Sequence, residues 1–353
     1  MRTASVVYWY GSDEMPRDGG GLRALAWQAA LSELGFKTTI HALRSAGVGV
    51  QTQTHLRKLK KKLIPMPLRS VLPSMTNADL NVVTVPSVFD SAAKILPQKS
   101  LVFDWMDLWS VNARTMGKAS ILSRPGGWCQ SLFWEARQRR LVKIPSANVF
   151  AGFDDVRLTH SIGASPGFWI PTPITPKTGG EKGKQALPRA VGFIGNFDYP
   201  PNVMSLRKFL DTYAGEFSRK GIAIKVAGYG SEVVNDWSVP VDVLGRLDSL
   251  SDFYSTIDAA IVPIDHGGGI KAKAVEAMAY GVPVIGTRHV ASGFSPKWRS
   301  YIGSIEDLLE KPIKLPPAPT AEEFDNQFSQ QAFTESVRSM LERAGHMTAR
   351  SAL

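Results

Sequence analysis

The chain has 353 residues, 44% of them hydrophobic, and a formal net charge of +10. Because single hydrophobic cores stop growing at about 250–300 residues, this length favours two domains. One cysteine, Cys129, excludes an internal disulfide, and no apolar run reaches the roughly 18–20 residues that cross a bilayer. With no basic and apolar leader at its start, the sequence predicts a cytoplasmic protein.

The first half of the chain alternates strand-like and helix-like segments. A β-branched and aromatic run at 3–10 leads into a loop that ends in "DGGG" at 18–21, and helical spacing then continues to Gly35. A second strand over 37–43 completes a β-α-β unit, which predicts a parallel sheet. Further elements of this half are expected as strands over 80–87 and 100–107, and as a helix followed by a strand over 133–153.

A stretch rich in Pro, Gly and Lys at 171–188 predicts a linker, after which the pattern restarts with a strand at 189–197. The later elements are expected as strands over 222–230, 241–247 and 258–265 and as helices over 202–221, 249–257, 304–310 and 320–345. Two successive β/α sets indicate an α/β protein with two Rossmann-like, doubly wound domains facing each other across a cleft. We expect these domains at 1–175 and 186–320, with a C-terminal helix in 321–353 that can pack back on the first domain.

The positive charge is concentrated in the first half, where residues 1–175 hold 21 Lys and Arg against 11 Asp and Glu. In "HLRKLKKKLIPMPLRSVL" at 55–72, Leu56, Leu59 and Leu63 recur at helical spacing. Basic side chains fill the rest of that surface: Arg57, Lys58, Lys60, Lys61 and Lys62.

This amphipathic stretch has two open interpretations. It is either a solvated helix face or a contact with an anionic membrane, to which each Lys or Arg contributes ~1 kcal/mol. Nucleic acid is not expected as a partner, because no helix-turn-helix, zinc or aromatic stacking signature accompanies the basic residues.

The stretch "DHGGGIKAKAVEAMAYGVPVIG" at 265–286 places three glycines before a helix that we expect to begin near Ile270. Such a junction favours phosphate, to which Lys271 and Lys273 add charge. Glu276 lies on a neighbouring part of the same face and can accept two hydroxyl hydrogen bonds from a ribose. Alternatively, the glycines only make a turn, and Lys273 and Glu276 form an exposed pair worth ~0.3–0.5 kcal/mol.

With the strand that follows, "GGGIKAKAVEAMAYGVPVIGT" resembles the nucleotide-sugar signature of glycosyltransferases of the GT-B fold with a group 1, family 4-like C-terminal domain. "VGFIGNFDYPPNVMSLRKFL" at 191–210 is similar to the first C-terminal strand and loop of that group. "VAGYG" at 226–230 and "LGRLDSLSDFYSTIDAAIVP" at 244–263 follow in the family's order. The resemblance is specific over about 190–290 and weaker in the N-terminal half.

The resemblance implies transfer of a sugar from a nucleoside diphosphate donor to a glycan or lipid-linked acceptor, at the inner face of a bacterial plasma membrane, in polysaccharide or glycoconjugate synthesis. It implies that Glu276 binds the ribose. The diphosphate would contact Gly268, Gly269, Ile270, Lys273 and Lys271. Gly195, Asn196 and Asp198 would line the donor site, Arg246 would lie near the base, and Gly20 and Gly21 would face phosphate or acceptor.

One position departs from the family pattern. Many retaining members carry a glutamate eight residues before the ribose-binding one, and this chain has Gly268 there. The retaining or inverting outcome therefore stays open.

Glycosyl transfer needs a base for the acceptor hydroxyl and neutralisation of the departing diphosphate. Lysines and helix N-termini serve the second need, and no Asp-x-Asp follows a strand, so we expect neither a metal nor a cofactor. Asp104 and Asp107 in "FDWMDLWS" are the candidate bases; alternatively, Asp107 caps a helix and Asp104 makes a structural hydrogen bond. His266 either touches the sugar or phosphate, or is structural.

Three other functions compete with glycosyl transfer. A nucleotide-sugar epimerase of related fold would leave the basic stretch unused, and a dehydrogenase would need G-x-G-x-x-G after the first strand, which "GSDEMPRDGGG" lacks. A two-domain binding protein would keep the cleft without turnover.

Overall fold

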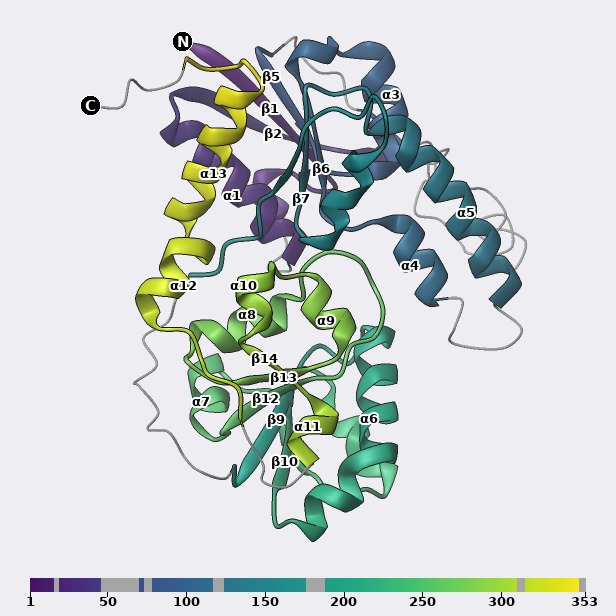
Figure 1. Cartoon of the computed structure of the whole chain (residues 1–353), viewed down its shortest axis with the longest axis vertical. Coiled ribbons are helices and arrows are strands. Elements are labelled where there is room, and N and C mark those ends of the chain that lie inside the picture. The colour runs from purple at the N-terminus through teal and green to yellow at the C-terminus, as the bar shows by residue number, and fades with distance from the viewer. Residues whose placement is uncertain are drawn as a thin grey trace. The chain divides into compact units, whose positions relative to one another are not determined.

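The computed structural model describes residues 1–15, 19–45, 70–72, 78–116, 124–175, 188–309 and 315–348. They form two compact units, Met1–Pro173 with Gln330–Leu353, and Ile174–Ser329 (Figure 1). Each unit contains a six-stranded parallel sheet with helices, which confirms the predicted doubly wound α/β class.

The sheet of the first unit has the order β2-β1-β5-β6-β7-β8, and every neighbouring pair is parallel. Its strands are β1 (Arg2–Tyr8), β2 (Phe36–Ala42), β5 (Leu80–Val83), β6 (Leu101–Trp105), β7 (Ala147–Phe150) and β8 (Gly167–Trp169). Strands β5, β6 and β7 are buried at every position, as expected for parallel strands covered on both faces. A separate antiparallel pair joins β3 (Arg44–Ser45) to β4 (Ser70–Val71), so the end of the basic stretch at 55–72 is a strand.

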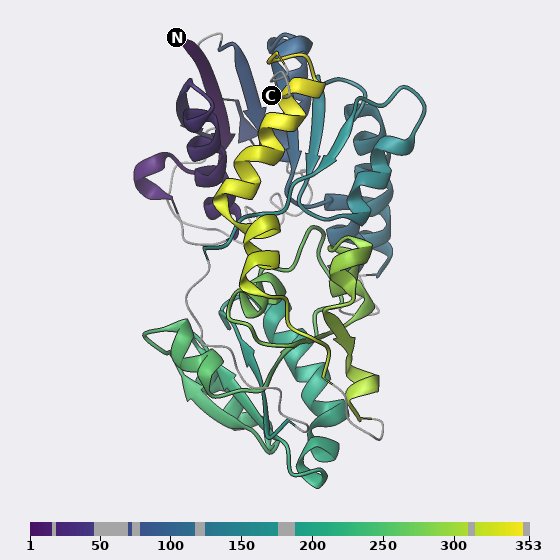
Figure 2. The ribbon, with the colours of Figure 1, turned by 60° about the vertical axis from the view of Figure 1, so that its left-hand side comes forward.

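The helices of the first unit are α1 (Gly19–Glu33), α3 (Phe89–Ile95), α4 (Trp109–Met116), α5 (Arg124–Leu141) and α13 (Gln330–Arg343). Helix α13 comes from the far end of the chain and lies along α1 (Figure 2). The buried Trp27 indole meets the Phe333 ring edge-on with centroids 5.5 Å apart, and the Gln330 side chain donates to the Ala26 carbonyl at 3.2 Å. Apolar packing thus fixes this C-terminal helix in the core of the first unit.

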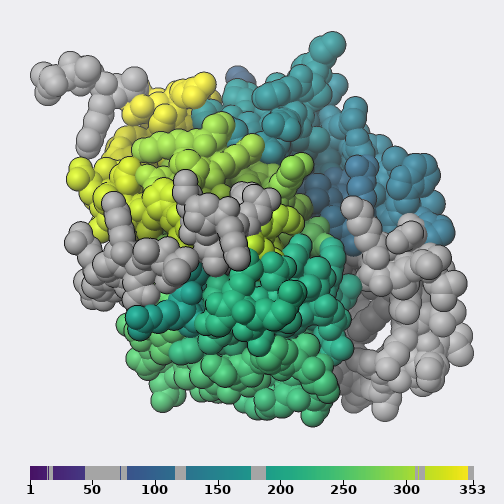
Figure 3. Space-filling view, turned by 60° about the horizontal axis from the view of Figure 1, so that its bottom comes forward, coloured from purple at the N-terminus to yellow at the C-terminus, as the bar shows by residue number. Residues whose placement is uncertain are grey.

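The second unit has the strand order β11-β10-β9-β12-β13-β14, also with all neighbours parallel. Its strands are β9 (Ala190–Ile194), β10 (Ala223–Ala227), β11 (Asp242–Gly245), β12 (Ala259–Val262), β13 (Val284–Gly286) and β14 (Ile302–Ser304). Its helices are α6 (Pro200–Arg219), α7 (Leu250–Ser255), α8 (Ala272–Ala279), α9 (Arg288–Ser292), α10 (Pro296–Arg299), α11 (Ile305–Leu309) and α12 (Ala321–Phe328). Figure 3 shows the outer surface of this unit in teal and green. The order of its strands reverses between β9 and β12, which makes that point the expected ligand site.

The segment 321–353, expected as one C-terminal helix, contains two helices that belong to different units. Helix α12 begins at a capping box, in which Thr320 and Glu323 bond each other's backbone. It ends at Phe328, and the residue after it, Ser329, has an extended backbone. Helix α13 then starts at Gln330. The extended residue between the helices allows the chain to leave one core and enter the other.

Candidate functional site

The candidate site of the second unit lies at the carboxyl ends of β9 and β12, the two neighbouring strands between which the strand order reverses. Gly195 and Asn196 directly follow β9, and the glycine loop at 267–269 lies between β12 and α8. Parallel strands place both loops at one edge of the sheet. The fold therefore brings together residues that are about 70 positions apart in the sequence.

Hydrogen bonds from neighbouring side chains hold the backbone of the glycine loop in place. Gly267 and Gly269 have φ angles of 85° and 67°, which few other residues adopt. The Lys271 ammonium donates to the carbonyls of Gly267 (3.0 Å) and Gly268 (2.6 Å), and Nε2 of His289 lies 2.6 Å from the Gly267 carbonyl. Lys271 is only 9% exposed, so its charge is directed at the loop backbone.

Helix α8 begins at Ala272, two residues later than expected, and carries Lys273 in its first turn. Nζ of Lys273 lies 3.0 Å from where a Cβ on Gly195 would stand, and 5.5 Å from the centre of the Phe193 ring. Burial lowers the pKa of Lys273, and the negative charge of Glu276 opposes that shift. Its ammonium therefore lies beside the loop after β9 as a partly desolvated charge suited to an anion.

Glu276, one turn further along α8, is held by a tyrosine. The Tyr254 hydroxyl donates to Oε2 of Glu276 at 3.1 Å, and its ring stacks on Tyr280 with centroids 4.6 Å apart. Burial, followed by the Glu276 charge, raises the pKa of Tyr254 well above its ordinary value, so the phenol stays a donor. The carboxylate is partly exposed and held in position, as a ribose ligand must be.

The loop after β9 is shaped by a close backbone approach. Gly228 has a φ of 119°, and a Cβ there would stand 1.9 Å from the Gly195 carbonyl oxygen. The Asn202 amide donates to the Asn196 carbonyl at 2.8 Å, and the backbone N–H of Asp198 donates to Oδ1 of Asn196 at 2.8 Å. The side chains of Asn196 and Asp198 are exposed at this loop.

Two further predicted donor residues have distinct surroundings. Arg246 follows β11 and is exposed. Nδ1 of His266 lies 3.0 Å from Oδ1 of Asp265 and 3.4 Å from the Ser205 hydroxyl on α6, and its buried Nε2 has no hydrogen-bond partner among the described residues. His266 therefore faces α6, which fits the structural alternative.

Of the two candidate bases, Asp104 lies within β6 and is fully buried. Its carboxylate accepts from Nε and Nη2 of Arg23 at 2.7 and 2.8 Å and from the Trp27 indole at 2.6 Å. Arg23 also donates to the Ile170 carbonyl at 2.8 Å. A carboxylate with three donors and no exposed surface suits a structural ion pair and not a base that must reach a hydroxyl.

The other candidates of the first unit lie nearer its surface. Asp107 follows β6 and is partly exposed. Gly20 stands in the first turn of α1, where a Cβ would lie 2.3 Å from the Tyr8 hydroxyl, and the neighbouring Gly21 is buried. Packing against Tyr8 is thus one reason for glycine at position 20.

Three expectations concern metals and membranes. The basic residues Arg57, Lys58, Lys60, Lys61 and Lys62 lie outside the described part of the chain. Within that part, no cluster of three His, Cys, Asp or Glu side chains could hold a metal ion. None of the described helices combines the length and the apolar character of a membrane span.

Comparison with known proteins connects this geometry to a family. Residues 188–296 match the family described as glycosyl transferases group 1. No curated protein matches the chain. Sucrose-phosphate synthase from Thermosynechococcus elongatus has a similar structure, with a TM-score of 0.67 at 12% identity, over 97% of this chain and 99% of that one.

Two further solved structures resemble the chain over almost its whole length. Anabaena Alr3699/HepE in complex with UDP and glucose has a TM-score of 0.58 at 10% identity and covers 97% of this chain and 100% of its own. The α,α-trehalose 6-phosphate synthase from Burkholderia multivorans has a TM-score of 0.54 at 11% identity, over 98% of this chain and 99% of that one. At these identities the structures show the shared fold, and the family match over residues 188–296 includes Lys273 and Glu276. The chain therefore has the GT-B fold, and its residues 188–296 are similar to the glycosyl transferases group 1 family.

Proposed function

We propose that the protein transfers a sugar from a nucleoside diphosphate donor to a glycan or lipid-linked acceptor, without a metal ion, at the inner face of the plasma membrane in polysaccharide or glycoconjugate synthesis. The observation that carries the donor half is the pairing of a cation and a carboxylate on α8. Lys273 points its ammonium at the loop after β9, and Glu276 is held by Tyr254 one turn later.

Each group has a chemical task in this proposal. The Glu276 carboxylate accepts hydrogen bonds from the ribose hydroxyls. The Lys273 ammonium and the N-terminus of α8 neutralise charge on the diphosphate as the anomeric bond breaks. Lys271 keeps the loop carbonyls turned toward itself and so fixes the backbone on which the diphosphate rests.

The acceptor half of the proposal involves residues of the first unit. Asp107, partly exposed after β6, is the proposed base that takes the proton of the acceptor hydroxyl. Gly20 and Gly21 at the start of α1 are proposed to face the acceptor or the phosphates. The excess of basic residues in the first half suits an acceptor anchored in an anionic membrane.

The test begins with thermal shifts for a panel of nucleoside diphosphates and their sugars, because a ligand of the native state raises the melting temperature. The sugar donor that gives the largest shift is then incubated with membrane lipid extract. Release of nucleoside diphosphate that depends on the extract supports the proposal. Conversion of the donor into another nucleotide sugar would indicate an epimerase, and tight binding without turnover a binding protein.

A further inference from the structure

One surface of the first unit does not take part in the site described above. Helix α5 buries one face, which includes Trp134 and Leu141. On its opposite face, three large apolar side chains are exposed: Trp128 (58%), Leu132 (43%) and Phe133 (48%). Cys129 is exposed beside them. We call these four residues the α5 surface.

The spacing of these residues puts them on one side of the helix. Trp128 and Leu132 are four residues apart, as are Cys129 and Phe133, so they form two adjacent rows. The Phe133 ring meets the buried Trp134 ring edge-on with centroids 5.6 Å apart, and Trp134 packs in turn on Trp109 of α4 at 4.7 Å. The exposed apolar side chains are therefore supported from below by packed aromatic side chains of α4 and α5.

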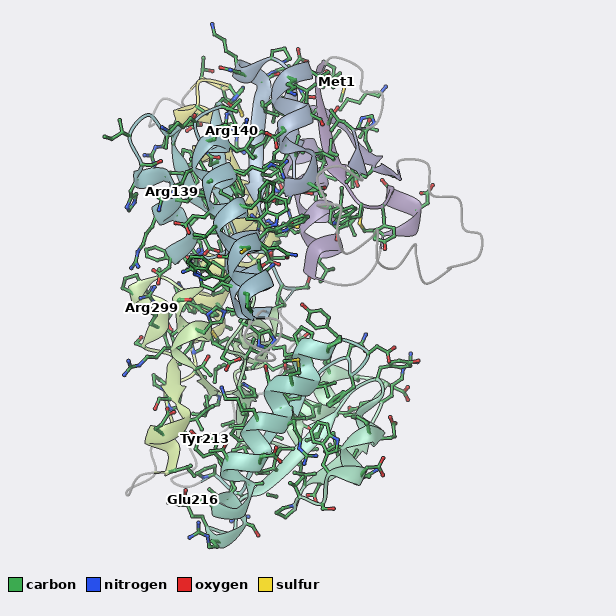
Figure 4. All side chains as sticks on the ribbon, turned by 90° about the vertical axis from the view of Figure 1, so that its right-hand side faces the viewer. Met1, Arg139, Arg140, Tyr213, Glu216 and Arg299 are labelled. Carbon is green, nitrogen blue, oxygen red and sulfur yellow. The ribbon has the colours of Figure 1, made fainter. Side chains whose placement is uncertain are left out.

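Positive charge follows on the same helix. Arg139 and Arg140, each 65% exposed, lie seven residues after Leu132 and Phe133, about two turns further along α5 and on the same side of the helix. Both arginines are labelled in Figure 4. Residues 109–143 contain seven Lys and Arg and a single acidic residue, Glu135. Glu135 pairs with Arg139 (2.7 Å) and Arg114 (3.4 Å), and Asp90 of α3 pairs with Arg140 and Arg137. Two carboxylates thus face four arginines, and the charge of this region stays positive.

We propose that the α5 surface docks on an anionic lipid bilayer, with Trp128, Leu132 and Phe133 entering the headgroup boundary and the arginines lying on the lipid phosphates. A tryptophan, a phenylalanine and a leucine on one helical face, with arginines beside them, are the residues that lie in a membrane interface. An exposed apolar group of this kind marks an interaction surface. This inference rests on the membrane location in the proposed function and assigns it to described residues distinct from the basic stretch at 55–72.

The position of Cys129 gives a direct test, because it is the only cysteine in the chain. The full-length protein is labelled there with a polarity-sensitive nitrobenzoxadiazole dye and mixed with vesicles of phosphatidylglycerol and phosphatidylcholine. The expected result is a blue shift, increased emission, and quenching by lipids that carry a nitroxide on the acyl chain. The control is Cys129→Ser with Ile162→Cys, since Ile162 is 95% exposed elsewhere in the unit, and its dye should not respond.

Binding is then measured by co-sedimentation with the same vesicles. Trp128→Ser with Leu132→Ser and Phe133→Ser should lower the partition coefficient about tenfold or more. Ile95→Ser with Ile162→Ser removes two exposed apolar residues outside the α5 surface and should leave it unchanged. Arg139→Gln should lower it about fivefold, and only on vesicles with anionic lipid.

Wild-type binding by the triple variant, or a dye at Cys129 that stays in water while the protein binds, would overturn the proposal. A concentration-dependent dimer that the triple variant abolishes would assign the surface to a second copy of the chain instead. Binding of nucleoside diphosphates in the absence of lipid should be equal for wild type and triple variant. A failure of the docking inference therefore leaves the proposed donor site intact, and a lack of nucleotide binding leaves the docking result intact.

Discussion

Asp104 in the first unit and Glu276 in the second are both carboxylates held by an aromatic donor, and the two regions use them differently. Asp104 accepts from the Trp27 indole and from Nε and Nη2 of Arg23, and it has no exposed surface. Glu276, within helix α8, accepts from Tyr254 and remains partly exposed. The number of hydrogen-bond donors around a carboxylate and its exposed surface therefore separate a structural role from a ligand-binding role.

The strongest test of this comparison removes the buried carboxylate. Asp104→Ala leaves the Arg23 guanidinium buried without its counter-ion, and the free energy of unfolding should fall by about 3–5 kcal/mol. Urea denaturation measures this loss. Arg23→Met in the same chain should recover part of it, because no unpaired charge then remains. A stable Asp104→Ala protein without transferase activity would instead make Asp104 the base.

The second test acts on the backbone of the donor site. Gly228→Ala forces a Cβ toward the Gly195 carbonyl and keeps a positive φ, which should cost more than about 2 kcal/mol of stability. Gly281→Ala is the matched control, since its φ is 66° and no atom lies within 4 Å of the new Cβ. It should cost about 1–2 kcal/mol. Equal melting temperatures for the two variants would show that the loops do not meet as described.

The third test compares the two aromatic donors. Tyr254→Phe removes the hydroxyl that orients Glu276 and should weaken nucleoside diphosphate binding by about 0.5–1.5 kcal/mol. In a Glu276→Gln background the same change should have almost no effect, because the two residues act as one unit. Trp27→Phe, in contrast, should lower stability and leave nucleotide affinity unchanged. Additive losses from Tyr254→Phe and Glu276→Gln, measured by calorimetry, would refute the positioning role.

The smallest expected effect concerns pH. Because burial lowers the pKa of Lys273, its ammonium loses its proton below the ordinary value of 10.5, and diphosphate affinity should fall there as pH rises. Lys273→Arg stays charged and should keep its affinity over that range. The buried charge also lowers stability at neutral pH, and this cost is relieved as pH rises through the folded pKa toward the unfolded one. An identical pH dependence of affinity in both proteins would exclude Lys273 as the diphosphate ligand.

Much of the fold can be predicted from the sequence, because the hydrophobic spacing typical of a strand or a helix is visible within a short stretch of residues. The run at 3–10, the helix at 202–221 and the strand at 258–265 match β1, α6 and β12 to within a few residues. Strands β8 and β14 were not predicted, since three residues are too short to show a period. The division of 321–353 into two helices at Ser329 was not predicted either. Two adjacent helices with the same hydrophobic spacing give the sequence pattern of a single longer helix.

The candidate site was predictable only where its residues are neighbours in the chain. Gly268, Lys273 and Glu276 share one strand-to-helix junction, and its local pattern identifies them. Tyr254 lies 22 residues before Glu276, and Arg23 lies 81 residues before Asp104. Those contacts depend on how the strands are ordered, which a single sequence does not show. The buried role of Asp104 and the support of Glu276 therefore required the structure.

Calorimetric titration of UDP, GDP and ADP into the wild-type and Glu276→Gln proteins tests whether α8 holds the nucleoside diphosphate. The wild type should bind at least one of them, and Glu276→Gln should weaken that binding by about 1.5–3 kcal/mol, the range for hydrogen bonds to a charged group. Equal affinities of the two proteins for each nucleotide would contradict the assignment of the donor site to α8.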